Sequence, residues 1–522
     1  MDARCADAVF YNGKVLTFST DKKTARAIAV ADGEIISIGT DVEIRRSAPR
    51  GCEKVDLGGK LVVPGFIDCH THFIQMGVDS LSVDLSATGS LDQAMGLMRA
   101  AALKIRKGEW IIATNWSESR WDGGRFVSRA DLDECCPDHP AVAHRVCGHM
   151  STVNSNAIKR IGIDRTTPGA ETDSTGNPTG IMKEAGVSVV RAAAAPTPEM
   201  KMKGLQLAIR KAHSLGVTSV QDNGSVDDFP VLRRAERDGK LGVRVWFNTP
   251  CSELQSLLRL GVSTGFGSER LKLGGLKIFC DGALGARSAA LSEPFADDPG
   301  NSGMFVHPVD ELNEMVGKAD EAGIQLAIHA IGDEGIEVAI SSIERALDVS
   351  RRNDHRHRIE HLELPRPDHI KRMGRRKMIA SMQPNFVGEW SGIDGMYVER
   401  LGPERAGMNN PFKEVLGAKV RLVFGSDCMP FSPIYGIRSA VNASYPSQRL
   451  NVEEAFLSYT RNAAYASFEE NRKGTISTGK VADFIVLSDD PFHDPDALDS
   501  LSVLKTVVGG EVVFDRSTRS RK

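Results

Sequence analysis

Short apolar runs alternate with turn residues over the first sixty residues of the chain. Residues 8–10 precede Asn12-Gly13, residues 27–30 precede Asp32-Gly33, and residues 34–38 precede Gly39. Asn-Gly and Asp-Gly between apolar runs are strong β-hairpin signals. The pattern therefore predicts a small antiparallel β unit at this end of the chain.

A similar pattern returns at the carboxyl end, where apolar residues 482–487 and 503–508 are followed by Gly509-Gly510 and residues 511–514. Each end alone has too few strands for a stable core, but together they could close one small sandwich. We therefore expect a discontinuous β-sandwich domain built from residues 1–60 and 473–522.

Between the two ends, short apolar runs alternate with longer helical patterns such as residues 205–215, 309–322 and 335–347. This alternation is typical of βα units with a parallel sheet. Eight candidate strands can be counted, at residues 61–67, 217–220, 243–247, 276–279, 325–328, 358–360, 378–382 and 422–424. The predicted fold is α/β, a (β/α)8 TIM-type barrel over residues 61–472.

A long excursion separates the first two candidate strands, at about residues 79–197. It holds a predicted helix at 91–105, two further strand-like runs at 110–113 and 141–146, and a Gly- and Thr-rich segment at 169–180 that reads as a loop. Long insertions near a barrel mouth usually shape the substrate pocket, so we expect this one to do so.

Composition narrows the function class. The 522 residues carry a net charge of -3, with 65 Lys and Arg against 68 Asp and Glu, which gives no electrostatic footprint for nucleic acid or an anionic membrane. Nine cysteines without a Cys-x-x-Cys motif favour reduced thiols in a cytoplasmic protein, and neither a signal sequence nor a long apolar span is visible. A small-molecule substrate is the better prediction.

The first barrel strand ends in a polar cluster of Asp68, His70 and His72. Residues two apart in an extended segment point the same way, so His70 and His72 can present two imidazoles to one divalent metal ion. A pair of hydrogen-bonded histidines at a strand end is the alternative for this motif taken alone.

Four further polar residues lie at or near the carboxyl ends of other candidate strands: Lys277 on the fourth, His329 on the fifth, His361 on the sixth and Asp427 after the eighth. In a barrel these ends converge on one face. The joint pattern therefore predicts a metal site more strongly than any single residue does.

With this set of residues the chain resembles the amidohydrolase superfamily, and within it the YtcJ-like branch that includes N-substituted formamide deformylases. The resemblance spans nearly the whole chain. It is carried by the segments VVPGFIDCHTH, GHMSTVNSNAI at 148–158, PTGIMKEAG at 178–186, KIFCDGALGARSAAL at 277–291, AIHAIGD, IEH, SMQP at 381–384 and GSD.

The resemblance implies two divalent ions. His70, His72 and Asp427 would hold one, His329 and His361 the other, and Lys277 would bridge them as an N6-carboxylated lysine, because an ammonium group cannot ligate a metal. An ordinary buried lysine paired with Asp281 is the alternative. Zinc is the default for these donors, although iron, manganese or cobalt would also fit.

The pKa of a water molecule shared between two cations falls from near 16 toward about 7, so hydroxide is available at neutral pH. Asp427 would then be the general base that returns its proton to the leaving nitrogen, unless it is only a helix cap after Ser426. Asp68, Glu360 and Asp333 are candidate partners for the histidines, or residues with purely structural hydrogen bonds.

Substrate contacts are predicted within the excursion at His149, Asn154, Glu184 and Trp116. A buried structural histidine is the alternative for His149, Asn154 and Glu184 could equally have structural roles, and Trp116 could belong to the core. After SMQP, where the branch commonly has a histidine, this chain has Asn385 and Phe386, so the pocket is expected to be more apolar.

The predicted function is a metal-dependent hydrolase of a non-peptide carbon–nitrogen bond in an amide, formamide or N-acyl compound. Esters, lactones and phosphoesters are alternative substrates of such a site, and a metal-dependent decarboxylase or isomerase is disfavoured. A non-catalytic scaffold or regulator would be expected to lack ligands, whereas this set is complete. A homodimer is compatible with the sequence, since barrels with this appended domain often associate.

Overall fold

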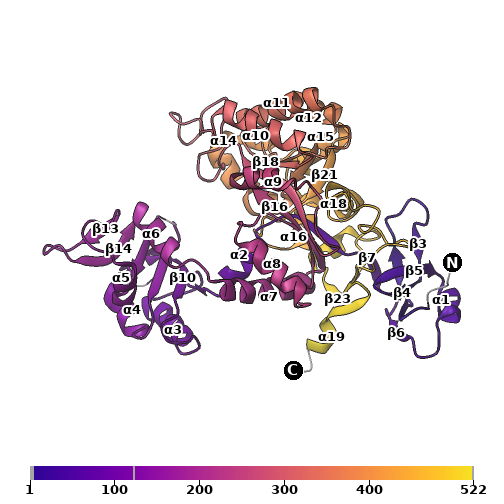
Figure 1. Ribbon diagram of the computed structural model, residues 1–522, viewed down its shortest axis with the longest axis horizontal. Coiled ribbons are helices and arrows are strands. Elements are labelled where there is room, and N and C mark those ends of the chain that lie inside the picture. The colour runs from indigo at the N-terminus through magenta and orange to yellow at the C-terminus, as the bar shows by residue number, and fades with distance from the viewer. Residues whose placement is uncertain (1–4, 122–123, 148, 520–522) are drawn as a thin grey trace. The chain divides into compact units, whose positions relative to one another are not determined.

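The computed structural model describes residues 5–121, 124–147 and 149–519, so Gly148, the first residue of the segment at 148–158, lies outside the described residues. The chain divides into two compact units, one of Met1–Phe73 with Ala208–Lys522 and the other of Ile74–Leu207 (Figure 1). The predicted excursion at 79–197 falls within the second unit, while the finer domain boundaries stay a prediction. No helix in the described parts of the chain is long and apolar enough to cross a bilayer.

The barrel is an eight-stranded parallel sheet in the first unit, in the order β21-β20-β19-β18-β17-β16-β15-β8. Every candidate barrel strand contributes to it, which confirms the predicted α/β barrel. Its strands are β8 (Phe66–Thr71), β15 (Val217–Asp222), β16 (Arg244–Pro250), β17 (Leu271–Phe279), β18 (Gln325–Ala330), β19 (Arg358–His361), β20 (Ile379–Met382) and β21 (Arg421–Phe424).

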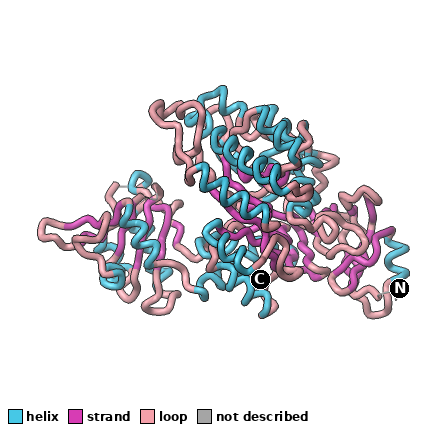
Figure 2. The backbone as a smooth tube through the Cα atoms, turned by 45° about the horizontal axis from the view of Figure 1, so that its top comes forward, coloured by secondary structure: helices cyan, strands magenta, loops and turns pink. Residues whose placement is uncertain are grey.

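Helices follow the strands and surround them, as Figure 2 shows. The predicted helices at 205–215, 309–322 and 335–347 are confirmed. Those of the first unit are α1 (Asp41–Ser47), α8 (Asp228–Arg237), α9 (Leu254–Leu260), α10 (Val309–Glu321), α11 (Asp333–Ser350), α12 (Pro367–Arg376), α13 (Pro384–Trp390), α14 (Met396–Met408), α15 (Phe412–Gly417), α16 (Pro433–Val441), α17 (Val452–Ser458), α18 (Arg461–Ala466) and α19 (Arg516–Arg519); α2 (Phe73–Asp79) and α7 (Pro198–Ser214) span the unit boundaries.

The chain after β21 closes the barrel against β8. The backbone N–H of Asp427 donates to the carbonyl oxygen of His70 at 2.8 Å. A Cβ at Gly425 would lie 2.4 Å from the His70 nitrogen, so only glycine allows this approach. Closure therefore brings two predicted ligand positions, 357 residues apart in sequence, side by side.

The two termini share a small β sandwich, as predicted. One sheet has the order β5-β4-β1-β6 and the other β24-β23-β22-β7-β2-β3. The strands are β1 (Ala8–Tyr11), β2 (Lys14–Leu16), β3 (Thr24–Ala25), β4 (Ala27–Ala31), β5 (Glu34–Gly39), β6 (Glu53–Asp56), β7 (Leu61–Pro64), β22 (Phe484–Leu487), β23 (Val503–Val508) and β24 (Glu511–Asp515). Phe10 packs edge-on against Phe484 at 4.9 Å between ring centroids, so both ends of the chain contribute to one core.

Two local predictions at the amino end are wrong. Asn12-Gly13 does not close a hairpin, because β1 and β2, on either side of it, belong to different sheets. The apolar run 61–67 is not one barrel strand: β7 pairs with β22 in the sandwich, and β8 begins the barrel after Gly65. Both sheets bury apolar residues, so the run continues through the junction and hides it.

The described part of the second unit has a six-stranded sheet in the order β13-β14-β12-β11-β10-β9, accompanied by helices α3 to α6 and by parts of α2 and α7. The segment 169–180, predicted as a loop, is a loop at 173–177, but its two ends belong to an antiparallel strand pair, because its Thr residues suit strands as well as turns. The elements are β9 (Val83–Asp84), β10 (Ile111–Trp116), β11 (Ala141–Arg145), β12 (Met150–Val153), β13 (Ala170–Thr172), β14 (Pro178–Lys183), α3 (Leu91–Ala102), α4 (Arg129–Cys135), α5 (Ser155–Ile161) and α6 (Ala185–Ala193).

Candidate metal centre

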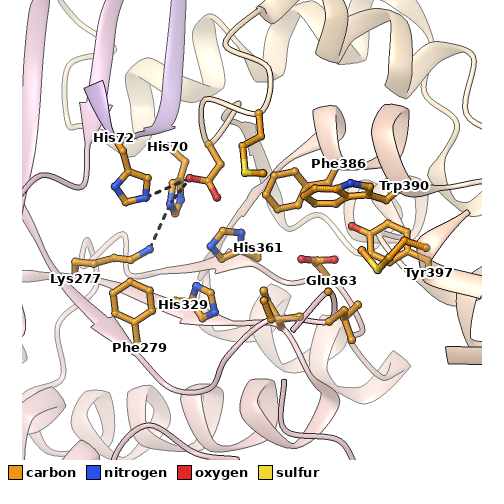
Figure 3. Close-up of a pocket in the computed structure, with 17 residues that line it drawn as sticks. His70, His72, Lys277, Phe279, His329, His361, Glu363, Phe386, Trp390 and Tyr397 are labelled. Atoms are coloured by element: carbon orange, nitrogen blue, oxygen red, sulfur yellow. Dashed lines mark hydrogen bonds and ion pairs between the residues drawn. The ribbon is translucent and has the colours of Figure 1, made fainter. Parts of the chain in front are cut away.

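All six predicted ligands line one cavity of about 390 Å³ at the carboxyl ends of the barrel strands (Figure 3). They come from five strand ends, because His70 and His72 belong to the same one. The remaining walls are mostly apolar. The lining residues beyond the predicted ligands are Phe279, Ala283, Leu284, Gly285, Ile331, Glu363, Phe386, Trp390, Met396, Tyr397 and Met429.

Three of these side chains form a compact group of donors. Nε2 of His72 lies 3.3 Å and Nε2 of His70 3.8 Å from Oδ1 of Asp427. The ligand atoms of the three residues all lie within 4.8 Å of one another. Burial would raise the pKa of the Asp427 carboxyl, but His70 and His72 outweigh it and lower this pKa below its usual value. The carboxylate form that a metal requires is therefore favoured.

Second contacts orient the two imidazoles. Nδ1 of His70 lies 2.6 Å from Oε2 of Glu360, and Nδ1 of His72 lies 2.9 Å from the carbonyl oxygen of Asn223. Both partners are acceptors, so each Nδ1 donates, and in the neutral imidazole Nε2 is the nitrogen with the lone pair. Burial lowers the pKa of His70 and favours its neutral form, whereas burial is outweighed at His72 by the hydrogen bond to Asp427, which raises the pKa of His72. The two Nε2 atoms that face Asp427 are therefore the nitrogens that a metal would take.

Glu360 is itself fixed by a buried cation. Its Oε1 accepts a hydrogen bond from Nε of Arg358, whose other nitrogens donate to the backbone oxygen of Cys69 and to the side chain of Gln221. Burial would raise the pKa of Glu360, but the charge of Arg358 outweighs it and holds this pKa far below its usual range. A permanent anion therefore lies behind His70.

The other two candidate partners of the histidines behave differently. Oδ1 of Asp68 accepts from the backbone N–H groups of His70 and Ser426, and burial raises the pKa of Asp68 to about 7. Asp333 instead accepts from the backbone of Ser292 and pairs with Arg366 at 3.2 Å. Asp68 therefore joins β8 to the segment after β21, and Asp333 has a structural role.

Lys277 lies beside His70 at one end of the cavity. Its Nζ is 3.4 Å from Nε2 of His70, and burial lowers the pKa of Lys277 to about 8. In the described residues it forms no ion pair with Asp281, the alternative partner, whose oxygens accept backbone N–H groups from Ala290, Ile331 and Gly332. The lysine thus approaches the predicted ligands rather than a structural anion.

His329 and His361 form a second pair, with ring centroids 4.4 Å apart. Nδ1 of each is buried and has no hydrogen-bond partner among the described residues, and Nε2 of His329 lies 3.0 Å from the carbonyl oxygen of Gly282. Burial and the nearby Lys277 lower the pKa of His329 to about 3. Neutral imidazoles with free nitrogens fit a metal ion, as does the group around Asp427.

The backbone at two ligand positions is unusual. His361 has a φ of 71° and Asp427 a φ of 51°, and the residue after each, Leu362 and Cys428, also has a positive φ. Non-glycine residues seldom adopt this region, and such outliers gather where a surrounding structure holds a functional side chain in place. The turns direct both ligands into the cavity.

The pocket wall contains residues that the sequence reasoning partly missed. Phe386, noted as a departure from the family pattern, stacks on His361 with an interplanar angle of 11°. Asn385 points away and donates to the backbone oxygens of Pro430 and Ser432. Glu363 was not predicted, although its position two residues after His361 was a usable signal; burial raises its pKa to about 7.

The predicted substrate contacts His149, Asn154, Glu184 and Trp116 all lie in the second unit. Trp116 is buried in its core and donates from Nε1 to the carbonyl oxygen of Ala143 at 3.1 Å. Asn154 is the buried N-cap of α5. His149 and Glu184 are exposed, and Nδ1 of His149 lies 3.1 Å from Oε2 of Glu184. Substrate binding by these four residues stays a prediction.

Comparison with known proteins agrees with this geometry. A model of the amidohydrolase family matches residues 53–514. The Bacillus subtilis protein YtcJ is 31% identical, over 98% of this chain and 100% of its own length. The N-substituted formamide deformylase of Arthrobacter pascens is 27% identical, over 98% of this chain and 99% of its own. An uncharacterized metal-dependent hydrolase from Pyrococcus furiosus superposes with a TM-score of 0.81 and 30% identity, covering 93% of this chain and 99% of that one.

Proposed function

Because the chain belongs to the amidohydrolase family of metal-dependent hydrolases, we propose that it cleaves a non-peptide carbon–nitrogen bond in an amide, a formamide or a similar N-acyl compound. The observation that carries the proposal is the group of His70, His72 and Asp427, whose ligand atoms lie within 4.8 Å of one another at the cavity. The likeness to an N-substituted formamide deformylase over nearly the full length of both chains supports this bond class.

The site has donors for two divalent ions. His70, His72 and Asp427 would hold one, and His329 and His361 the other. When bound, the ions would polarise a substrate carbonyl and acidify the attacking water. Imidazole and carboxylate donors suit zinc, and iron, manganese or cobalt would accept the same set.

Lys277 would join the two halves as a carbamate. The ammonium group would first lose a proton to water, and the neutral amine would then form a bond to the carbon of carbon dioxide and release a second proton to water. The product would be a carbamate anion, which could ligate metal ions where an ammonium group cannot. Burial supports this step, because the lowered pKa of Lys277, about 8, increases the neutral fraction of the amine. The distance of 3.4 Å between Nζ of Lys277 and Nε2 of His70 also supports this role.

Asp427 would move the proton. Its carboxylate faces both His70 and His72, and its lowered pKa keeps it ionised and able to accept a proton from the attacking water. The same oxygen would then protonate the leaving nitrogen. Glu360 and the carbonyl of Asn223 would hold His70 and His72 in place throughout.

A substrate panel with the metal-loaded protein tests the proposal. N-formyl and N-acetyl amines would be compared with esters, lactones and phosphoesters of similar size, and the released amine, alcohol or phosphate quantified by chromatography. We expect at least one N-acyl amine to have a kcat/KM about tenfold or more above every other class. A phosphoester, lactone or ester as the best substrate would overturn the assignment.

A further inference from the structure

The cavity has a second polar region besides the ligands, formed by Glu363 and Tyr397. Their exposed fractions are 3% and 1%, and both side chains line the cavity. Figure 3 shows Glu363 on the other side of His361 from Lys277, next to Tyr397. This region therefore adjoins the metal centre and extends the site beyond the ligands.

Two polar atoms in this region have no hydrogen-bond partner among the described residues. They are Oε2 of Glu363 and the hydroxyl of Tyr397, which are buried and lie close enough to shift each other's pKa without forming a well-oriented hydrogen bond. Buried polar groups are almost always satisfied, and an unpaired buried carboxylate costs the most. A ligand that brings a hydrogen-bond donor or a positive charge would remove this cost.

The charged side chains that line the cavity indicate the charge of the ligand that this region would bind. The residues that line the cavity include one Lys or Arg side chain, Lys277, which lies at the His70 end rather than beside Glu363 and would be an anion as the proposed carbamate. No arginine is among these described lining residues, so a substrate carboxylate or phosphate would find no counter-ion near Glu363. The region favours a cation over an anion.

Aromatic rings around Glu363 favour an organic cation in particular. Trp390 packs against Phe386 at 4.6 Å and stands perpendicular to Tyr397 at 6.2 Å between ring centroids. Aromatic faces attract alkylammonium groups, and rings combined with a carboxylate are a common recognition device for them. Met396 and Met429, which also line the cavity, suit the apolar part of such a molecule.

We propose that the substrates carry a second, protonated nitrogen, held by Glu363 and the rings of Trp390 and Tyr397 while the scissile N-acyl group faces the metal centre. The substrate class is thus an N-acylated diamine or a related amide with a basic group. This inference rests on the proposed function for the scissile bond, but the recognition of the cation does not depend on turnover. Glu363 is a specificity residue in this assignment.

A binding measurement tests the cation site without turnover. Benzylamine, protonated near pH 7, and benzyl alcohol have the same ring and nearly the same size, and isothermal titration calorimetry with the metal-loaded protein compares their dissociation constants. We expect benzylammonium to bind at least tenfold more tightly, and Glu363→Gln to weaken it at least tenfold, or about 1.4 kcal/mol. Equal binding of the two probes by the unmodified protein would overturn the proposal whether or not the variant folds.

Two further variants separate the site from general effects. Glu414→Gln removes one negative charge from an exposed position on α15 and should leave the preference for benzylammonium as it is. Tyr397→Phe keeps the ring and removes the hydroxyl, so we expect benzylammonium to bind about threefold more weakly. A preference that survives Glu363→Gln would show that the ammonium binds elsewhere, for instance on a metal ion, and would contradict the assignment.

A matched pair of substrates links the cation site to catalysis. N-[4-(aminomethyl)benzyl]formamide and N-(4-methylbenzyl)formamide share the scissile bond and differ in the terminal ammonium. We expect kcat/KM to favour the first by tenfold or more and Glu363→Gln to remove that preference; equal kcat/KM values would contradict the inference. If neither is cleaved, the proposed bond class is wrong for formamides, and the binding preference alone decides the cation site.

Discussion

Residues from the barrel and from the second unit both lie in motifs of the family resemblance, yet their surroundings in the structure differ. The barrel residues His70, His72 and Asp427 come together with their donor atoms free to face one point. In the second unit, the polar side-chain atoms of Asn154 and Trp116 form hydrogen bonds with backbone groups of the same unit. Motifs of the same family resemblance thus form a candidate reaction centre in the barrel and make local structural contacts in the second unit.

The difference follows from topology. Closing a parallel barrel brings the carboxyl ends of all eight strands to one face, so a polar residue there meets others regardless of its position in the sequence. In the second unit, Asn154 precedes a helix and Trp116 ends a strand, and each satisfies a need of its own element. A motif therefore predicts chemistry best when the fold forces it to meet another motif.

The largest effect is expected for Asp427→Asn. The amide keeps the size of the side chain but can neither accept a proton nor ligate a metal as an anion, so kcat should fall by about 10³-fold or more. The assay uses the best N-acyl substrate, with circular dichroism to verify the fold. Activity within tenfold of the unmodified protein would remove Asp427 from the mechanism.

Lys277→Ala should reduce the metal content measured by plasma mass spectrometry from about two ions per chain to one or fewer, because the bridging group is lost. Lys272→Ala is the matched control on the same strand: Nζ of Lys272 pairs with Glu469 at 3.0 Å and does not line the cavity. The control should retain the metal. An unchanged metal content in Lys277→Ala would return this residue to the role of a buried lysine.

Glu360→Gln tests the support behind His70. Loss of the anion that accepts from Nδ1 should weaken metal binding by about 10- to 100-fold, as measured by competition with a chelator. Asp333→Asn is a control, because that carboxylate contacts Ser292 and Arg366 instead of a ligand histidine. If both variants bound metal equally, Glu360 would be no more than a structural partner of Arg358.

The sequence predicted the barrel because strand signals and helix signals alternated with little ambiguity, and each of the eight candidate strands contributes residues to one sheet. It missed the junction at Gly65, because a run that is buried in two successive sheets has no polar residue to mark the boundary. It also predicted a hairpin at Asn12-Gly13, since turn chemistry reports a reversal of the chain but not the sheet that each strand joins.

The candidate ligands were predictable because His, Lys and Asp at strand ends are few and chemically distinct. Glu363 and Tyr397 were not, since their role depends on an unpaired buried atom, and burial of a single side chain cannot be read from a sequence without the packing around it. Trp116 shows the converse: an aromatic residue in a substrate-like motif whose indole N–H is satisfied by Ala143. Polar satisfaction, rather than residue type, separates the two cases.

The smallest effect is expected for Asn154→Ala, measured as stability rather than turnover. Oδ1 of Asn154 accepts from Ala157, capping α5, and from the backbone N–H of Ala141, while Nδ2 donates to the carbonyl oxygen of His139 at 2.8 Å. The substitution removes the cap of α5 and leaves the buried N–H of Ala141 unpaired. The free energy of unfolding should therefore fall by about 2 kcal/mol, which hydrogen exchange would detect as faster exchange in α5. His149→Ala, at an exposed position, should cost less than about 0.5 kcal/mol. A raised KM in Asn154→Ala with unchanged exchange would instead support the substrate contact that the motif predicts, and the contrast between the two regions would disappear.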